Sequence, residues 1–331
     1  MLTLLPWQQA DWMQFAAQYE RLPGALLLTG PQGIGKGQFA QRVAQALLCE
    51  APQVHHAPCG VCPACQWLVA ESHPDYRQLT PDRADEDEGK GPRKLAQIKI
   101  ERVREVIAFA QLSAHRAGRR VIVISPVEAL NSAAANALLK LLEEPPLGVY
   151  FILVTQNSAR VLPTLLSRCR QFPMTQPGPQ VALAWLTEQG VARAETELAF
   201  AGGAPLALLE MAQVALRDRL VSVLAHPSVD ACLAVAAELD SAKIALEQPL
   251  TWLLKWVYDL AQCALVHTIR YFPEQRTTLE ALAPRVNIAL LMSFQQQVLD
   301  LVPFGQHTLS VKLQIEKFLL EYQALFSRAA R

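Results

Sequence analysis

The sequence lacks both a charge surplus and a long uninterrupted apolar run. Its 331 residues include 30 Lys and Arg against 30 Asp and Glu, so the formal net charge is zero. A protein that binds nucleic acid by itself usually has a basic excess, so we expect any contact with DNA to be local or shared with partners. The most apolar helical stretch, residues 250–269, is interrupted by Lys255 and Asp259 and is not expected to span a membrane. The first residues lack the basic and apolar regions of a signal peptide, which predicts a cytoplasmic protein.

Apolar residues make up 51% of the chain, which predicts a globular, helix-rich protein with a sizeable core. Apolar strands alternate with helical segments in the first half. Because this alternation is typical of a parallel sheet with helices on both faces, we predict an α/β domain there. Beyond a segment rich in proline and glycine (residues 173–179), helical periodicity runs to the end. The spacing of Trp252, Trp256 and Tyr258 favours packing in a core or subunit interface over base stacking.

The seven cysteines argue against a disulfide framework in a cytoplasmic chain. Four of them form a cluster with two successive C-x-x-C steps: Cys49, Cys59, Cys62 and Cys65. Four thiolates at this spacing predict a closed, structural zinc site. The alternative is a set of buried or redox-active thiols. Three nearby histidines could each replace one thiolate: His55, His56 and His73. The remaining cysteines are expected in the core.

Residues 30–37, G-P-Q-G-I-G-K-G, resemble a phosphate-binding loop with one part missing. In the full pattern, the backbone amides and a lysine surround phosphates and a final Ser or Thr holds Mg²⁺. The candidate phosphate-binding residues are Gly30, Gly33, Gly35 and Lys36. Gly37 occupies the hydroxyl position, and the strand at residues 121–124 runs into Ser125 and Pro126 where an acidic pair would support Mg²⁺.

Two further segments identify the chain as similar to the clamp-loader branch of the AAA+ ATPases. Residues 136–146 read N-A-L-L-K-L-L-E-E-P-P, and residues 167–169 read S-R-C. The resemblance implies an AAA+ P-loop domain at residues 1–172, with the zinc-binding insertion at about 49–65. A small helical lid at 173–210 and an all-α collar domain at 211–331 would follow.

The same resemblance implies a role in DNA replication. Such subunits form a ring of five, and the expected partners are ATPase subunits of the gamma or tau type and a delta subunit. The assembly would open a sliding clamp and place it on primer–template DNA. In this arrangement Arg168 would be an arginine finger that reaches the ATP of a neighbour. The alternative is that Arg168 pairs with a nearby carboxylate and caps a helix, and Arg170 is the lesser candidate.

Hydrolysis by this chain itself is not expected. Besides Gly37, Ser125 and Pro126, the resemblance places Pro205 where active subunits have a phosphate-sensing arginine, while Thr155 or Asn157 could serve as the other sensor. Binding of ADP or ATP without Mg²⁺ stays open, because the glycines and lysine that attract phosphate are retained. Two rival interpretations are an active P-loop ATPase or nucleotide kinase, and a zinc-dependent DNA-binding module.

Overall fold

The computed structural model describes residues 3–81, 97–115, 118–209, 213–302 and 310–327. These residues form two compact units, which we describe separately. The first contains the described residues up to Gly190 together with Ala204–Ala207, and the second contains Val191–Gly203 and the described residues from Leu208 onward. Residues 173–210 are therefore shared between the units, and the three-domain division stays a prediction.

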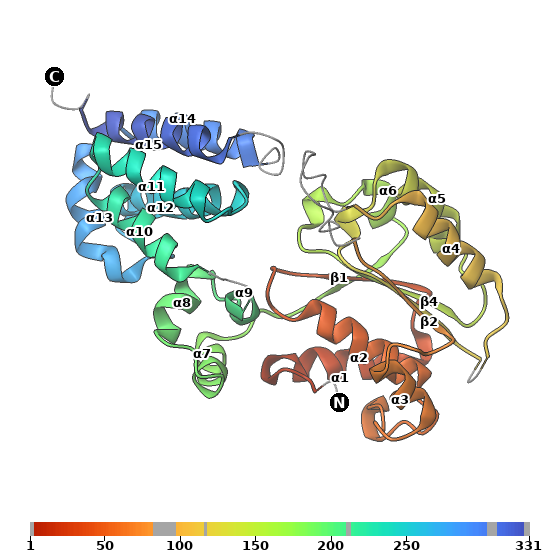
Figure 1. Ribbon diagram of the computed structural model, residues 1–331. Helices are drawn as coiled ribbons and strands as arrows, with labels where there is room; N and C mark the ends of the chain where they lie inside the picture. The colour runs from red at the N-terminus through yellow and green to blue at the C-terminus, as the bar shows by residue number, and fades with distance from the viewer. Residues whose placement is uncertain (1–2, 82–96, 116–117, 210–212, 303–309, 328–331) are drawn as a thin grey trace. The chain divides into compact units, whose positions relative to one another are not determined.

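A parallel five-stranded sheet forms the centre of the first unit (Figure 1). Its strands lie in the order β2-β3-β4-β1-β5, and every neighbouring pair is parallel. The strand bounds are β1 Ala25–Thr29, β2 Tyr76–Leu79, β3 Arg120–Ile124, β4 Val149–Val154 and β5 Arg170–Pro173. The central strands are buried on both faces, which explains why they appear in the sequence as continuous apolar runs. The strand at residues 121–124 and the alternation of apolar strands with helices confirm the prediction, while the short edge strand β5 was not predicted.

Helices cover both faces of this sheet (Figure 1). On one side lie α1 Gln9–Ala17, α2 Lys36–Leu48 and α3 Pro63–Val69, and on the other lie α4 Ile100–Gln111, α5 Ser132–Glu143 and α6 Pro163–Leu166. Each side has its own apolar core. Helix α7, Pro179–Glu188, also belongs to this unit, and the Trp185 ring meets Trp7 edge-on with centroids 5.4 Å apart. The predicted layered α/β domain is confirmed.

The second unit is helical throughout the part that the structure describes. Its helices are α8 Ala194–Phe200, α10 Val214–Ala225, α11 Val229–Ser241, α12 Glu247–Val266, α13 Arg276–Leu282, α14 Ile288–Leu301 and α15 Val311–Ser327, and the short α9, Pro205–Leu209, begins in the first unit. Trp256 is fully buried, and its Nε1 donates to the Tyr322 hydroxyl at 2.7 Å. That hydroxyl donates in turn to the Leu224 carbonyl at 3.1 Å. The core interpretation of Trp256 is therefore confirmed.

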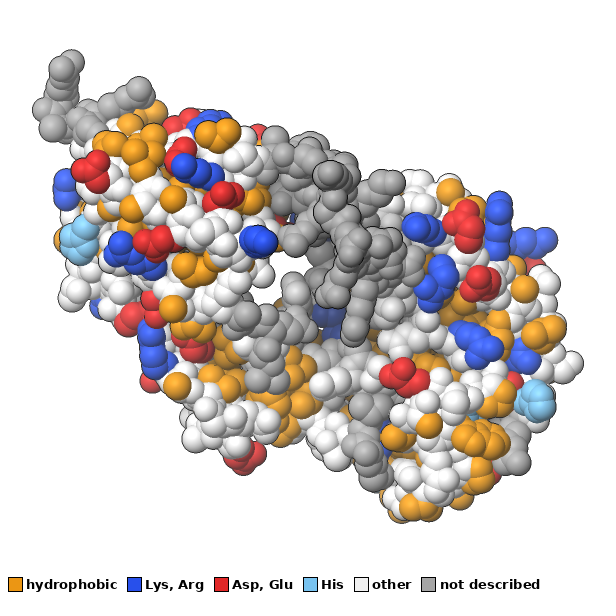
Figure 2. Space-filling view, in the orientation of Figure 1, with side chains coloured by type: hydrophobic (Ala, Val, Ile, Leu, Met, Phe, Trp, Pro, Cys, Tyr) orange, Lys and Arg blue, Asp and Glu red, His pale blue; other side chains and the backbone are white. Residues whose placement is uncertain are grey.

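The visible surface carries no block of charge of one sign among the described residues. Figure 2 shows Lys and Arg side chains interspersed with Asp and Glu on both units, as the zero net charge leads one to expect. No helix among the described residues is long and apolar enough to cross a membrane.

Candidate functional site

The phosphate loop connects the end of β1 with the start of α2. Gly30, Gly33 and Gly35 have φ angles of 139°, 78° and 89°, a backbone region that side chains with a Cβ rarely adopt. The glycines are therefore required by the turn itself. Among the described residues, the amides of Gly33, Gly35 and Lys36 donate to no protein acceptor. They remain available at the N-terminus of α2, where the helix dipole favours an anion.

Lys36 lies inside the loop rather than in solvent. Its side chain is 4% exposed, and its Nζ donates to the Gly30 carbonyl at 2.8 Å and to the Pro31 carbonyl. Burial lowers the pKa of Lys36 to about 8, while the Glu128 carboxylate opposes that shift. Within the described part of the chain, this buried cation is contacted directly by the two backbone carbonyls.

Gly37, Ser125 and Pro126 occupy the positions where Mg²⁺ ligands would be expected in the full pattern. Gly37 lies in the first turn of α2, and a Cβ added there would meet nothing within 4 Å. Beyond β3, Ser125 and Pro126 supply no carboxylate. There is room for a serine or threonine side chain at position 37. The hydroxyl is therefore missing because the sequence has glycine there, and not because the surrounding structure excludes a side chain.

Glu128, which was not predicted as a site residue, follows β3 and binds the backbone that follows β4. It lies in a short 3-10 helix, Val127–Ala129, and its Oε1 accepts from the amides of Gln156 and Asn157 at 2.7 and 2.6 Å. The Thr155 hydroxyl donates to the same oxygen. The Asn157 side chain accepts from the Ala159 amide at 3.0 Å. Both candidate sensor side chains therefore have partners within the chain.

Residues that lie outside the phosphate loop in the sequence also bind its backbone. The Leu206 amide donates to the Gly33 carbonyl at 2.9 Å, and a Cβ on Gly33 would lie 2.7 Å from Ala207. On the other side, Gln8 Nε2 donates to the Gly35 carbonyl at 2.9 Å. Leu206 and Ala207 directly follow Pro205, so the segment in which the resemblance predicts a sensor position packs on the loop.

Arg168 follows α6 and projects outward. Its neighbour Cys169 is 7% exposed and packs in the core with α5 and α6. The Arg168 Nε pairs with the Glu143 carboxylate at 2.9 Å, and its Nη1 donates to the Thr164 carbonyl at 3.1 Å. Within the described part of the chain, Nη2 has no partner. The predicted carboxylate pairing is therefore present, and the role as a finger stays a prediction, as does the lesser candidacy of Arg170 on β5.

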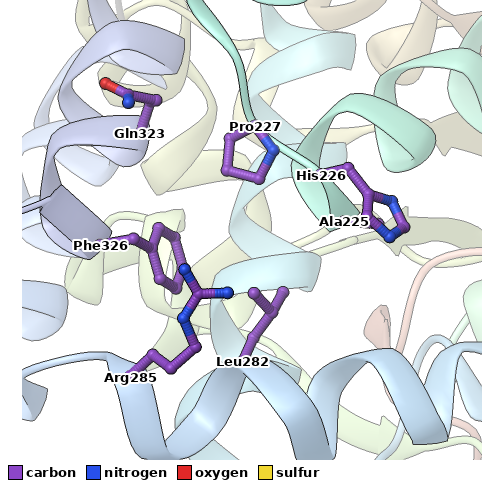
Figure 3. Close-up of a pocket in the computed structure, with 7 residues that line it drawn as sticks. All are labelled: Ala225, His226, Pro227, Leu282, Arg285, Gln323 and Phe326. Atoms are coloured by element: carbon purple, nitrogen blue, oxygen red, sulfur yellow. The ribbon is translucent and has the colours of Figure 1, made fainter.

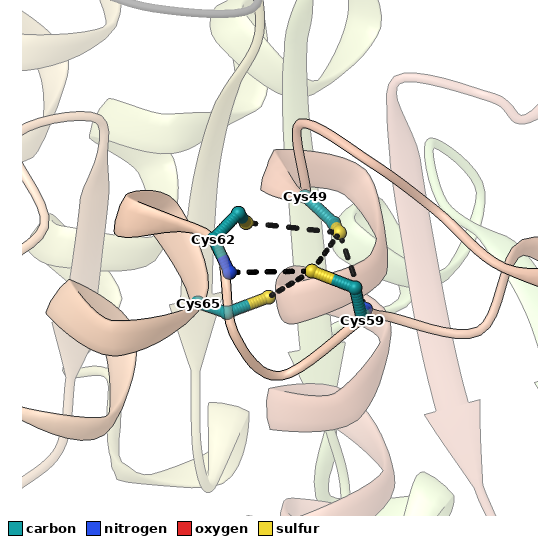
Figure 4. A group of neighbouring side chains, drawn as sticks. All are labelled: Cys49, Cys59, Cys62 and Cys65. Carbon is teal, nitrogen blue, oxygen red and sulfur yellow. Dashed lines mark hydrogen bonds between the residues drawn. The ribbon is translucent and has the colours of Figure 1, made fainter.

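The four clustered cysteines come together at the C-terminus of α2 and the N-terminus of α3 (Figure 4). The Sγ atoms of Cys49 and Cys59 are 3.6 Å apart, those of Cys49 and Cys62 are 3.9 Å apart, and those of Cys59 and Cys65 are 4.0 Å apart. Tetrahedral zinc at about 2.3 Å from each sulfur requires sulfur–sulfur distances of about 3.8 Å. The cluster therefore fits a metal ion such as zinc.

Two amides and one guanidinium complete the surroundings of the cysteine cluster. The Cys59 amide donates to Cys49 Sγ and the Cys62 amide donates to Cys59 Sγ, both at 3.3 Å. Backbone amides lower the pKa of the Cys59 thiol to about 6, whereas burial raises the pKa of the Cys65 thiol. Burial lowers the pKa of the Arg42 guanidinium, and thiolates at Cys65 and Cys49 oppose that shift. Arg42 would thus offset part of the negative charge of a four-thiolate metal site.

The predicted histidine alternatives are not part of the cluster. The described metal-ligand groups contain only the four cysteines. His56 stacks on Tyr19 with ring centroids 3.8 Å apart, and His73 Nδ1 accepts from the Asp75 amide at 3.0 Å. These contacts give the two imidazoles structural roles.

A pocket of about 380 Å³ lies in the second unit, remote in sequence from every predicted site residue (Figure 3). It is lined by Ala225, His226, Pro227, Leu282, Arg285, Gln323 and Phe326. None of the residues predicted to bind phosphate or metal, or to act as the finger, contributes to it.

The fold and the site together define a class. Four features are together typical of an AAA+ protein of the clamp-loader type. They are the parallel sheet with its phosphate loop, the helical region after it, the S-R-C segment and the four-cysteine insertion. The family model described as "DNA polymerase III, delta subunit" matches residues 7–177. The DNA polymerase III subunit delta′ of Pseudomonas aeruginosa is 37% identical over 227 residues, which cover 67% of this chain and 66% of that protein. The chain belongs to the delta′ family of DNA polymerase III subunits.

A second relative has the same subunit name. Subunit delta′ of Escherichia coli is 36% identical over 235 residues, 68% of this chain and 67% of that protein. The matched region thus spans about two thirds of the length of these relatives. A solved DNA polymerase III gamma-subunit-related protein from Thermotoga maritima aligns with 96% of this chain and 99% of its own at 15% identity, with a TM-score of 0.42, and the assignment does not rest on it.

Proposed function

We propose that this protein is a non-hydrolysing subunit of the DNA polymerase III clamp loader that acts on the ATP of a neighbouring subunit. Its partners would be ATPase subunits of the gamma or tau type and a delta subunit. Through that complex it would contribute to loading the sliding clamp on primed DNA. The family membership supports participation in this complex. The phosphate loop supports the absence of hydrolysis by this chain, and Arg168 supports an action on the neighbour's ATP.

The absence of hydrolysis is inferred from the phosphate loop. Mg²⁺ normally bridges the phosphates and is held by a loop hydroxyl and an acidic residue after a strand. Here these positions are Gly37, Ser125 and Pro126. The Glu128 carboxylate, which acts on the pKa of Lys36, accepts through its Oε1 from the backbone amides of Gln156 and Asn157. Lys36 and the available loop amides could attract phosphate, but they could not position a metal and a nucleophilic water.

The observation on which the proposed role in trans depends is the exposed guanidinium edge of Arg168. Two of its nitrogens are held by the chain, and Nη2 has no acceptor among the described residues. An arginine delivered to a γ-phosphate stabilises the charge of the transition state and contributes about 10³–10⁵ in rate in well-studied cases. The anchored Cys169 beside it would keep the position of that edge constant.

The cysteine cluster is proposed to hold structural zinc. Four sulfur ligands would fill a tetrahedral shell and leave no position for a substrate. The ion would join the end of α2 to the start of α3. It would supply folding energy and no catalytic step.

The test is ATP hydrolysis by the reconstituted loader with primed DNA and clamp, comparing the wild-type subunit with Arg168→Ala. We expect turnover to fall at least about tenfold while the subunit still co-elutes with its partners. The isolated subunit should show no turnover in the same assay. Unchanged loader turnover would refute the finger, and hydrolysis by the isolated wild-type subunit that Lys36→Ala abolishes would refute the non-hydrolysing role.

A further inference from the structure

Glu143 occupies a position that helix electrostatics disfavours. It is the last residue of α5, and Glu144 follows it directly. The carbonyl end of a helix carries partial negative charge, so a carboxylate there is destabilising unless a cation offsets it. The Arg168 guanidinium is that cation, with Nε 2.9 Å from Glu143 Oε2.

The contacts of Arg168 hold two of its guanidinium nitrogens and leave the third, Nη2, without a described partner. Glu143 accepts from Nε, and the Thr164 carbonyl accepts from Nη1 at 3.1 Å. The planar group is therefore held from two elements, α5 and α6. The Arg168 side chain is 30% exposed and Nη2 has no described partner, so Nη2 is available to an acceptor from another chain.

We propose that Glu143 is a positioning residue for the arginine finger, an inference that rests on the proposed function. By holding Nε, the carboxylate limits the rotamers of a long, flexible side chain before a neighbour's ATP arrives. Pre-ordering lowers the entropy that must be lost in the transition state. Glu143 touches no substrate, and its effect passes through Arg168.

Glu144 provides a matched control on the same helix end. It is exposed like Glu143, but no ion pair or side-chain hydrogen bond joins it to the described residues. Removing either carboxylate changes the charge of the subunit equally. Only removal of Glu143 breaks a contact of the guanidinium.

The experiment measures kcat and KM for ATP with the reconstituted loader and five variants of this subunit. Glu143→Ala should lower kcat about three- to fivefold, the order expected for losing an exposed charged contact, with KM for ATP unchanged. Glu143→Gln keeps an acceptor and should recover most of the loss. Glu144→Ala should match wild type, and Arg168→Ala with Glu143→Ala should be no slower than Arg168→Ala alone.

The outcomes separate this inference from the function on which it rests. If Arg168→Ala slows the loader while Glu143→Ala equals Glu144→Ala, or raises turnover, Glu143 does not position the finger and the proposed function stands. If Arg168→Ala has no effect, both ideas fail. A loss that is additive in the double variant would also overturn the positioning role.

Discussion

Replacing Lys36 with methionine should alter the pH dependence of stability in a defined direction. Lys36 is 4% exposed, and burial lowers its pKa from 10.5 to about 8. At about 1.4 kcal/mol for each pKa unit, holding this cation in the folded loop costs about 3 kcal/mol at pH 7.

The sign follows from the direction of the shift. A lysine whose folded pKa lies below its unfolded pKa destabilises the fold fully below the folded value, about pH 8 here. The penalty then shrinks as pH rises toward 10.5, because the folded state no longer holds the charge. Wild type should therefore gain about 1 kcal/mol relative to Lys36→Met between pH 7 and pH 9.

Urea unfolding of both proteins at pH 7, 8 and 9 measures this difference directly. Lys140→Met, at an exposed position on α5 of the same unit, is the control and should show a constant difference from wild type. A constant difference for Lys36→Met as well would refute the reasoning. The same assay with ADP tests the loop as an anion site, since a bound nucleotide stabilises the folded state. If the loop binds it, wild type should gain stability with ADP and Lys36→Met should not.

Three further predictions concern stability and metal content. Gly33→Ala should destabilise the protein by about 2 kcal/mol or more, because of its positive φ and the close backbone of the Ala207 segment. Gly37→Ala, in open space on a helix, should be neutral or stabilising by up to about 0.5–1 kcal/mol. If Gly33→Ala and Gly37→Ala lower the urea midpoint equally, the argument from backbone angle and space is wrong. The purified subunit should contain about one zinc ion per chain, and chelation should lower its melting temperature; a metal-free protein of the same stability would rule out structural zinc. Tyr322→Phe should cost about 2–3 kcal/mol, because it leaves a buried indole N–H and a carbonyl unpaired. Tyr258→Phe, at a half-buried position, is its control in denaturant unfolding, and equal losses would contradict the network.

Local sequence signals predicted the elements that carry the site. The apolar run at residues 25–29, followed by glycines and a helical pattern, places the loop between β1 and α2 where the structure has it. The spacing of the cysteines likewise predicted their cluster, because the four lie within 17 residues of one another along the chain, from Cys49 to Cys65. Such features depend on neighbouring residues, so sequence patterns capture them.

Contacts between distant segments could not be predicted in this way. The bonds of Glu128 to Gln156 and Asn157 join residues 28 and 29 positions apart, and no motif marks the acceptor. The seating of Ala207 on Gly33 depends on how the chain returns after α8. Strand β5 was missed because its four residues include Arg170, Gln171 and a proline, and its pairing with β1 makes it a strand.

The distribution of the seven cysteines has a practical consequence for single-molecule work. Cys169, Cys232 and Cys263 are buried, and burial raises the pKa of each thiol. The other four would be occupied once metal is bound. A maleimide dye should therefore react selectively with one cysteine introduced at an exposed site such as Leu112, on the loop after α4, without removal of any native thiol. The subunit can then be followed by fluorescence as it joins and leaves the proposed assembly.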